Sequence, residues 1–176
     1  MPEMPEITLR VLNPDTDVDA ASYRDLRLFA LQEAPEAFAS SYERESAQAL
    51  DFFRDRLSQE HGRFVLGAFS GAALVGVVGM YRDPGLKVRH RGHIWGMYVH
   101  PDQRKGGVGR ALLTEAIART RAVEGVELLD LGVGSENTPA LALYRALGFV
   151  STGIDPRGLK VNGQYIDEQR MCLIFD

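Results

Sequence analysis

Two spacings of apolar residues divide the chain into predicted elements. Alternating or continuous apolar runs predict strands at 7–12, 63–69, 73–81, 93–99, 126–133, 149–154 and 164–175. Helix formers, with apolar residues three or four positions apart, predict helices at 18–32, 46–58, 107–122 and 138–147. Ser70-Gly71 reads as a hairpin turn, while the middle of the chain reads as strand–helix–strand. This order predicts a mixed α/β fold: one central sheet of six or seven strands, mostly antiparallel, flanked by about four helices.

Composition fits one globular domain. The 176 residues are 45% hydrophobic and 25% charged, which is enough apolar material for a core without metal or disulfide. No linker or repeat divides the sequence, so we expect one domain over 1–176 with its core at about 7–175. The lone cysteine, Cys172, cannot form an internal disulfide, and its apolar neighbours predict a small buried residue rather than a catalytic thiol.

Charge and hydropathy argue against several classes of protein. A net charge of −4 gives no field for nucleic acid, although it suits an amine partner. No run of 18 apolar residues is present, so no membrane span is expected. The first six residues lack the pattern of a secretion signal, and a cytoplasmic location is therefore expected.

Residues 99–110 carry the strongest chemical signal. The segment leaves a predicted strand, turns at Pro101 and enters a predicted helix through three glycines. Glycine lets backbone N–H groups approach an anion closely, and the first N–H groups of a helix have no internal partners. Arg110 falls in the first turn, where the helix dipole alone would favour an acidic residue. The segment thus predicts a phosphate or pyrophosphate site; a solvated basic turn is the alternative.

Other phosphate loops fit less well. A dinucleotide loop needs G-x-G-x-x-G directly after a strand, but here no third glycine follows Gly107-Val108-Gly109. Asp130 has roughly the spacing of a ribose-binding acid, which we interpret as coincidence. A G-K-[ST] triplet is also missing. These departures disfavour a nucleotide-binding oxidoreductase.

Two motifs carry a resemblance to a known family. Arg-Lys-Gly-Gly-Val-Gly at 104–109 matches [QR]-x-x-G-x-[GA], and residues 137–149 match N-x-x-A-x-x-L-Y-x-x-x-G-F. On both motifs, and on the order of elements over nearly the whole chain, the sequence resembles the GNAT superfamily of acyl-CoA-dependent N-acyltransferases. The resemblance implies an enzyme that moves an acetyl group from acetyl-CoA to a primary amine by direct attack, with no metal. A CoA-binding module without turnover is the alternative.

The resemblance also assigns residues to the cofactor. It implies that the CoA pyrophosphate is bound by Arg104, Lys105, Gly106, Gly107, Val108, Gly109 and Arg110. The backbone of Met97, Tyr98 and Val99 would pair with the pantetheine arm in a gap between two splayed parallel strands. Gly96 fits either a β-bulge there or relief of packing against Trp95.

Asn137 and Tyr144 form a further candidate pair. They are seven residues apart, nearly two helical turns, so they point the same way about 10 Å apart along the axis. With the resemblance, Asn137 would bind the pantetheine amides and Tyr144 would protonate the thiolate that leaves. Without it, Asn137 reads as a helix cap and Tyr144 as a packing residue.

The general base and the acceptor stay open. His93 is the favoured base, since it titrates near neutral pH and lies where many family members carry Glu. Asp167 and Glu168 are rivals, and a merely packed histidine is the plain alternative. Charges of both signs between residues 24 and 43 give no selection among small amines, amino acids, antibiotics and protein amino groups. A second copy of the chain is kept as a candidate partner.

Overall fold

One sheet of seven strands organises the chain, in the order β1-β2-β3-β4-β5-β7-β6. Its strands are β1 Ile7–Val11, β2 Phe64–Ser70, β3 Ala73–Arg82, β4 Arg91–Val99, β5 Leu128–Gly134, β6 Val150–Val161 and β7 Gln164–Ile174. Only the β4–β5 pair is parallel; each of the other neighbouring pairs is antiparallel. This computed structural model describes residues 6–176, so the opening residues that bear on a secretion signal lie outside it. The predicted mixed, mostly antiparallel sheet is confirmed.

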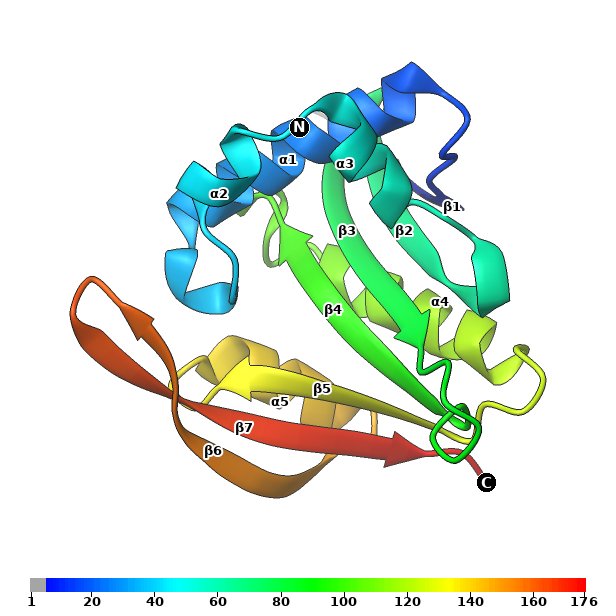
Figure 1. Cartoon of the computed structure of the whole chain (residues 1–176), viewed down its shortest axis with the longest axis vertical. Helices are drawn as coiled ribbons and strands as arrows, with labels where there is room; N and C mark the ends of the chain where they lie inside the picture. The colour runs from blue at the N-terminus through cyan, green and yellow to red at the C-terminus, as the bar shows by residue number, and fades with distance from the viewer. Residues whose placement is uncertain (1–5) are drawn as a thin grey trace.

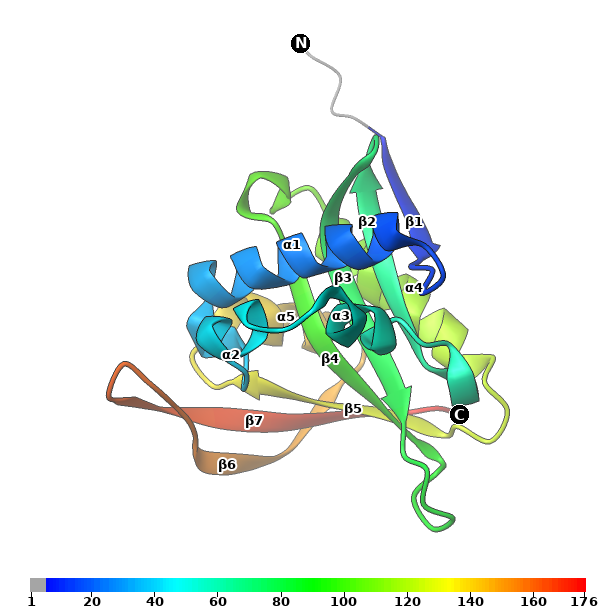
Figure 2. The same cartoon turned by 45° about the horizontal axis from the view of Figure 1, so that its top comes forward.

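Helices lie on both faces of the sheet (Figures 1 and 2). One face carries α1 Asp17–Glu33, α2 Tyr42–Ser46 and α3 Leu50–Arg56, and the other carries α4 Val108–Arg121 and α5 Thr138–Ala146. Short 3-10 turns occur at Pro35–Ala37, Glu60–Gly62 and Pro101–Gln103. None of the helices within residues 6–176 is both long and apolar enough to cross a bilayer.

Each face of the sheet has its own apolar core. Leu112 and Leu113 of α4 pack with Leu66, Leu129 and other strand residues on one side. On the opposite side, buried residues of α1 and α3 pack against strand residues including Val65, Val77 and Tyr98. Both clusters reach β4, which therefore lies between the two halves of the core.

Two predicted elements differ from the structure. The helix expected at 46–58 is two short helices, because Ser41 accepts from the Arg44 N–H and starts α2 well before residue 46. The strand expected to stop at residue 154 runs on to Val161. Its pairing with β7 shifts register between Asp155 and Leu159, and this irregularity accommodates Pro156 and Gly158. Pro and Gly usually end a strand, which is why the prediction stopped early.

Candidate active site

The parallel strands β4 and β5 part soon after they meet. Their pairing covers Arg91 with Leu128, Gly92 with Leu129, and His93 with Asp130. Beyond these three pairs β4 continues to Val99 and β5 to Gly134, and Figure 1 shows the two strands diverging. The open side of each strand leaves backbone N–H and C=O groups that an extended ligand could pair with. The structure thus contains the splayed parallel pair that the sequence led us to expect.

A β-bulge interrupts β4 inside this diverging segment. Val77 pairs with Tyr98 and Gly79 with Trp95, so Val78 faces both Gly96 and Met97. Gly96 has φ +59°, a left-handed conformation in which glycine is not strained. Of the two interpretations of Gly96, the bulge is the one the structure shows. The extra residue places Met97 and Val99 with the α4 core, while Tyr98 packs with the α1 core.

Tyr98 and Arg104 meet on the α1 side of β4. The Tyr98 hydroxyl donates to Glu33 Oε2 at 2.7 Å, and Arg104 Nη2 donates to the same oxygen at 2.9 Å. These two donors lower the pKa of Glu33, Arg104 first. Arg104 Nε also donates to the Val99 carbonyl at 3.0 Å. In this structure Arg104 therefore anchors the loop to the end of α1, and an anion would have to compete with Glu33 for it.

The glycine loop ends at the start of α4, which no side chain caps. Gly107 is the N-cap of α4 with φ +82°, no side chain caps the helix, and its first turn contains no acidic residue. A Cβ placed on Gly107 would meet nothing within 4 Å, whereas one on Gly109 would lie 3.3 Å from Met97 Cε and 3.5 Å from Leu143 Cδ2. Gly107 thus permits the turn, and Gly109 permits α4 to approach β4 and α5. Lys105, Gly106 and Arg110 are exposed beside this start, and Val108 is buried.

The second motif lies on α5, against the start of α4. Asn137 caps α5 by accepting from the Ala140 N–H at 3.3 Å, as the plain interpretation of that residue expects. Tyr144 is only 7% exposed and packs edge-on against Phe149, with ring centroids 5.7 Å apart. Burial raises the pKa of Tyr144 to about 12. Through Leu143, Gly109 and Met97 the two motifs meet in space, although residues 109 and 137 are 28 positions apart in the sequence.

His93 lies between two carboxylates where β4 and β5 are still paired. Nδ1 contacts Asp130 Oδ1, and Nε2 lies 2.5 Å from Asp83 Oδ2. The hydrogen bond with Asp130, followed by that with Asp83, raises the pKa of His93 despite its burial. Burial by itself would raise the pKa of Asp130, but hydrogen bonds from His93 and from Arg91 lower it. The imidazole thus holds its proton more firmly than a free histidine does.

The rival bases lie on the β6–β7 hairpin. Asp167 Oδ1 accepts from the Arg157 N–H at 2.8 Å, and the Asp167 carbonyl accepts from the Ser135 N–H at 2.8 Å. A Cβ on Gly158 would lie 2.8 Å from Glu168 Oε2, so that carboxylate folds over its own hairpin. Cys172 faces Asp130 across the β5–β7 pair, and burial raises the pKa of its thiol. Within residues 6–176 no group of His, Cys, Asp and Glu is arranged to hold a metal ion.

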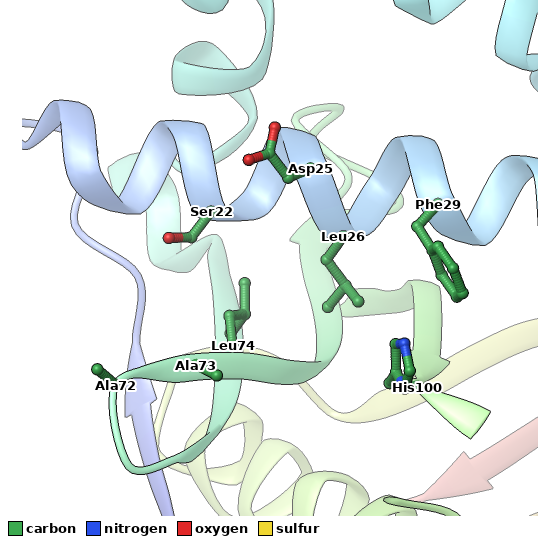
Figure 3. A pocket seen from close by; sticks show the side chains of 8 residues that line it. All are labelled: Ser22, Asp25, Leu26, Phe29, Ala72, Ala73, Leu74 and His100. Carbon is green, nitrogen blue, oxygen red and sulfur yellow. The ribbon is translucent and has the colours of Figure 1, made fainter. Parts of the chain in front are cut away.

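A shallow pocket of about 300 Å³ lies apart from the diverging strands (Figure 3). It is bounded by α1 and the β2–β3 turn, and its lining includes Ser22, Asp25 and Leu74. At one end the Phe29 and His100 rings stack with centroids 4.8 Å apart. This stacking ties the beginning of the glycine loop to α1. None of the predicted site residues lines this pocket.

Several charged neighbours of the site were not identified from the sequence. From the sequence, the spacing of Asp130 is interpreted as coincidence, yet its carboxylate contacts His93 and Arg91. Its signal was a lone charge within the apolar run 128–133, which usually marks a buried and partnered side chain. Glu45 is fully buried between Arg27 and Arg56, and no periodicity distinguishes it from the exposed Glu43 nearby.

A seven-stranded sheet with a bulged, splayed parallel pair and a glycine loop at a helix start defines the class of acyl-CoA-dependent acyltransferases. Comparison with known proteins then gives the family. Residues 27–149 match the model of the acetyltransferase (GNAT) family, and the chain belongs to that family.

Individual relatives of the chain are also named as acyltransferases. N-alpha-acetyltransferase RimI of Mycobacterium tuberculosis is 36% identical over 63% of this chain and 66% of its own length. L-amino acid N-acyltransferase MnaT of Escherichia coli is 36% identical over 46% of each chain, so the match covers about half of that relative. A GNAT-family acetyltransferase structure from Streptococcus pneumoniae superposes with TM-score 0.80 at 25% identity, over 97% of this chain and 100% of its own. A phosphinothricin acetyltransferase of Sinorhizobium meliloti in complex with AcCoA shares the fold, with TM-score 0.78 at 22% identity over 96% and 88% of the two chains.

Proposed function

We propose that this protein is an N-acetyltransferase that moves the acetyl group of acetyl-CoA to a primary amine by direct attack. The observation that carries the proposal is the meeting of the two motifs at the splayed strands, through Gly109, Met97 and Leu143. Acetyl-CoA is supported as the acyl donor by the solved complex of the Sinorhizobium meliloti relative. An amine acceptor is supported by the names of the sequence relatives.

The residues of the glycine loop fit the CoA pyrophosphate. Unpaired N–H groups at the start of α4, the left-handed Gly107 and a first turn free of acids favour an anion there. Positive charge comes from Arg104, Lys105 and Arg110. Arg104 would first have to give up its ion pair with Glu33 in order to bind the pyrophosphate. The pantetheine arm would pair with backbone groups of Met97, Tyr98 and Val99. Asn137 uses its side-chain oxygen to cap α5 and would offer its side-chain NH2 group to the arm.

Transfer requires the amine to lose a proton. An amine with the pKa of lysine, about 10.4, needs roughly 4.6 kcal/mol to become neutral at pH 7. His93 is the proposed base; it must first release the proton that Asp130 and Asp83 stabilise, so it becomes a base only above the ordinary histidine pKa of about 6.5. Asp167 and Glu168 remain rivals for this role.

Once neutral, the amine nitrogen attacks the thioester carbonyl carbon, and the C–S bond breaks. Backbone N–H groups near the Gly96 bulge would stabilise the charge on the carbonyl oxygen. The base keeps the first proton of the amine; the nitrogen loses its second proton as the C–S bond breaks, and one proton goes to the sulfur, so that CoA leaves as a thiol. Tyr144 would donate a hydrogen bond to the thiolate as it forms. No covalent intermediate on the protein is needed.

The test is release of CoA thiol from acetyl-CoA in the presence of amines, amino acids and peptides, with mass spectrometry of the products. We expect thiol release that depends on an amine, and an N-acetyl product. Tight acetyl-CoA binding without any acetylated product would favour the non-catalytic CoA-binding module instead.

We retain the cytoplasm as the proposed location and a homodimer as a proposed assembly.

A further inference from the structure

A buried ion cluster joins the three helices on the α1 face. Glu45 of α2 is fully buried and accepts from Arg27 Nε at 3.0 Å and Nη2 at 2.9 Å. The same carboxylate accepts from Arg56 Nη1 at 3.0 Å and Nη2 at 3.1 Å. Burial opposes the charge of Glu45, but hydrogen bonds led by Arg27 lower its pKa to about 2. Glu45 therefore keeps its negative charge at neutral pH.

The cluster has an excess of positive charge. Two guanidinium groups share one carboxylate, and within residues 6–176 neither arginine forms an ion pair with any other acid. The surroundings are aromatic: Arg27 lies over Phe38 at 4.7 Å, and Arg56 lies over Phe52 at 4.4 Å and Trp95 at 5.8 Å. The Arg27 side chain is 8% exposed, whereas that of Arg56 is 24% exposed and partly hydrated. A positive charge held away from water is costly unless an anion offsets it, and this applies mainly to Arg27. One arginine paired with one glutamate would have joined the helices without an excess of positive charge.

One nitrogen of the cluster points toward the proposed reaction centre. Arg27 uses Nε and Nη2 for Glu45, and among residues 6–176 its Nη1 makes no hydrogen bond. That nitrogen lies 3.5 Å from the position of a Cβ on Gly96. Gly96 is the bulged residue beside Met97, where the thioester is proposed to lie. Arg27 is only 7% exposed, and Glu45 fixes its guanidinium in place.

We propose that Arg27 binds a carboxylate of the acceptor, so that the acceptor class is an amino acid with its amine next to its carboxylate. The inference rests on the proposed N-acetyltransferase function and narrows its acceptor. Arg27 offers a preset donor with one accessible nitrogen, and such a donor discriminates against an analogue that lacks the anion. A carboxylate at Nη1 also offsets the excess charge and places the neighbouring amine beside the β4 bulge.

The experiment measures acetylation of matched acceptors by the full-length protein. Each L-amino acid is compared with its amide and with the amine that lacks the carboxylate, and short peptides are included. We expect kcat/KM for the best amino acid to exceed that for its amide and its amine by about 10- to 100-fold. R27K and R27Q should reduce this ratio to a few-fold while acetyl-CoA affinity changes little. R24Q is the matched control, because Arg24 lies one turn away on α1 and, within residues 6–176, pairs only with exposed Asp25.

The outcomes separate the two proposals. Acetylation of amides, simple amines or peptides at rates equal to or above those of amino acids would overturn the role of Arg27 and leave the N-acetyltransferase function standing. An equal loss for all acceptors in R27K would also overturn it, since that pattern indicates support of the bulge or of the carbonyl oxygen. Acetyl-CoA binding with no product from any acceptor would overturn the enzyme proposal itself. If R27Q does not fold, R27K still tests the role of Arg27, and equal wild-type rates for amino acids and amides still overturn the proposal.

Discussion

Among single side chains, the Tyr144 hydroxyl has the clearest chemical consequence. Its pKa of about 12 lies above the thiol pKa of about 8.5, so full proton transfer to the thiolate is uphill by roughly 5 kcal/mol. Hydrogen-bond donation to the developing charge needs no complete transfer. We expect Tyr144→Phe to bind acetyl-CoA nearly as well as the wild type and to lose ~10- to 1000-fold in kcat. Titration calorimetry and steady-state kinetics would measure the two effects separately.

Two results would contradict that role for Tyr144. Loss of acetyl-CoA affinity together with kcat would show that the ring positions the cofactor. An unchanged kcat on a confirmed acceptor would leave Tyr144 as packing against Phe149, with water protonating the sulfur.

The pair of carboxylates around His93 predicts an unusual pH profile. A raised pKa means that His93 becomes neutral only above the ordinary histidine value of about 6.5. If His93 is the base, kcat/KM should fall as pH drops through this raised pKa. Asp83→Asn removes one stabilising carboxylate, so the acid limb should move to lower pH, and His93→Ala should abolish it.

The control for this profile is Asp25→Asn, which changes an exposed acid on α1 whose one ion-pair partner in the described part of the chain is Arg24. Asp25→Asn should leave the acid limb of kcat/KM at the same pH as in the wild type. An acid limb unaffected by His93→Ala would transfer the role to Glu168, Asp167 or bulk water.

At the scale of helices and strands, the sequence predicted the features that a few adjacent residues determine. The glycine loop depends on a few neighbouring positions and is present. The bulge at Gly96 and the cap at Asn137 were each one of two open interpretations, and the structure contains both. The Asp83–His93–Asp130 contacts depend on strand register across 37 residues, which no local pattern shows. Glu45 likewise resembles its exposed neighbours until three helices enclose it.

Arg104 shows the same limit within a motif. Its position in the loop follows from the sequence, but its partner Glu33 lies 71 residues earlier, at the end of α1. The direction of a long side chain is set by tertiary contacts, whereas the glycine conformations around it are set by the turn itself. Local chemistry could therefore be predicted, while charge pairing between elements could not.

In the molecule as a whole, β4 and β5 connect the two halves of the sheet through only three residue pairs. A ligand that pairs with both strands should therefore stabilise the entire fold. At acetyl-CoA 100-fold above its Kd, binding adds about 2.7 kcal/mol, which corresponds to a rise in Tm of ~5–11 °C for a chain of this size. Differential scanning fluorimetry with acetyl-CoA, and separately with NAD, would measure it; NAD should give no rise.

Gly107→Val tests whether this stabilisation depends on the glycine loop. Gly107 and Gly163 have φ of +82° and +80°, and a Cβ on either would meet nothing within 4 Å. Valine should therefore strain the backbone similarly at both positions and lower the ligand-free Tm in both variants. Gly163 lies in the β6–β7 turn, so only Gly107→Val should also lose the acetyl-CoA rise. An equal rise in the two variants would place the pyrophosphate away from the start of α4, and an equal rise with NAD would restore the nucleotide-binding alternative.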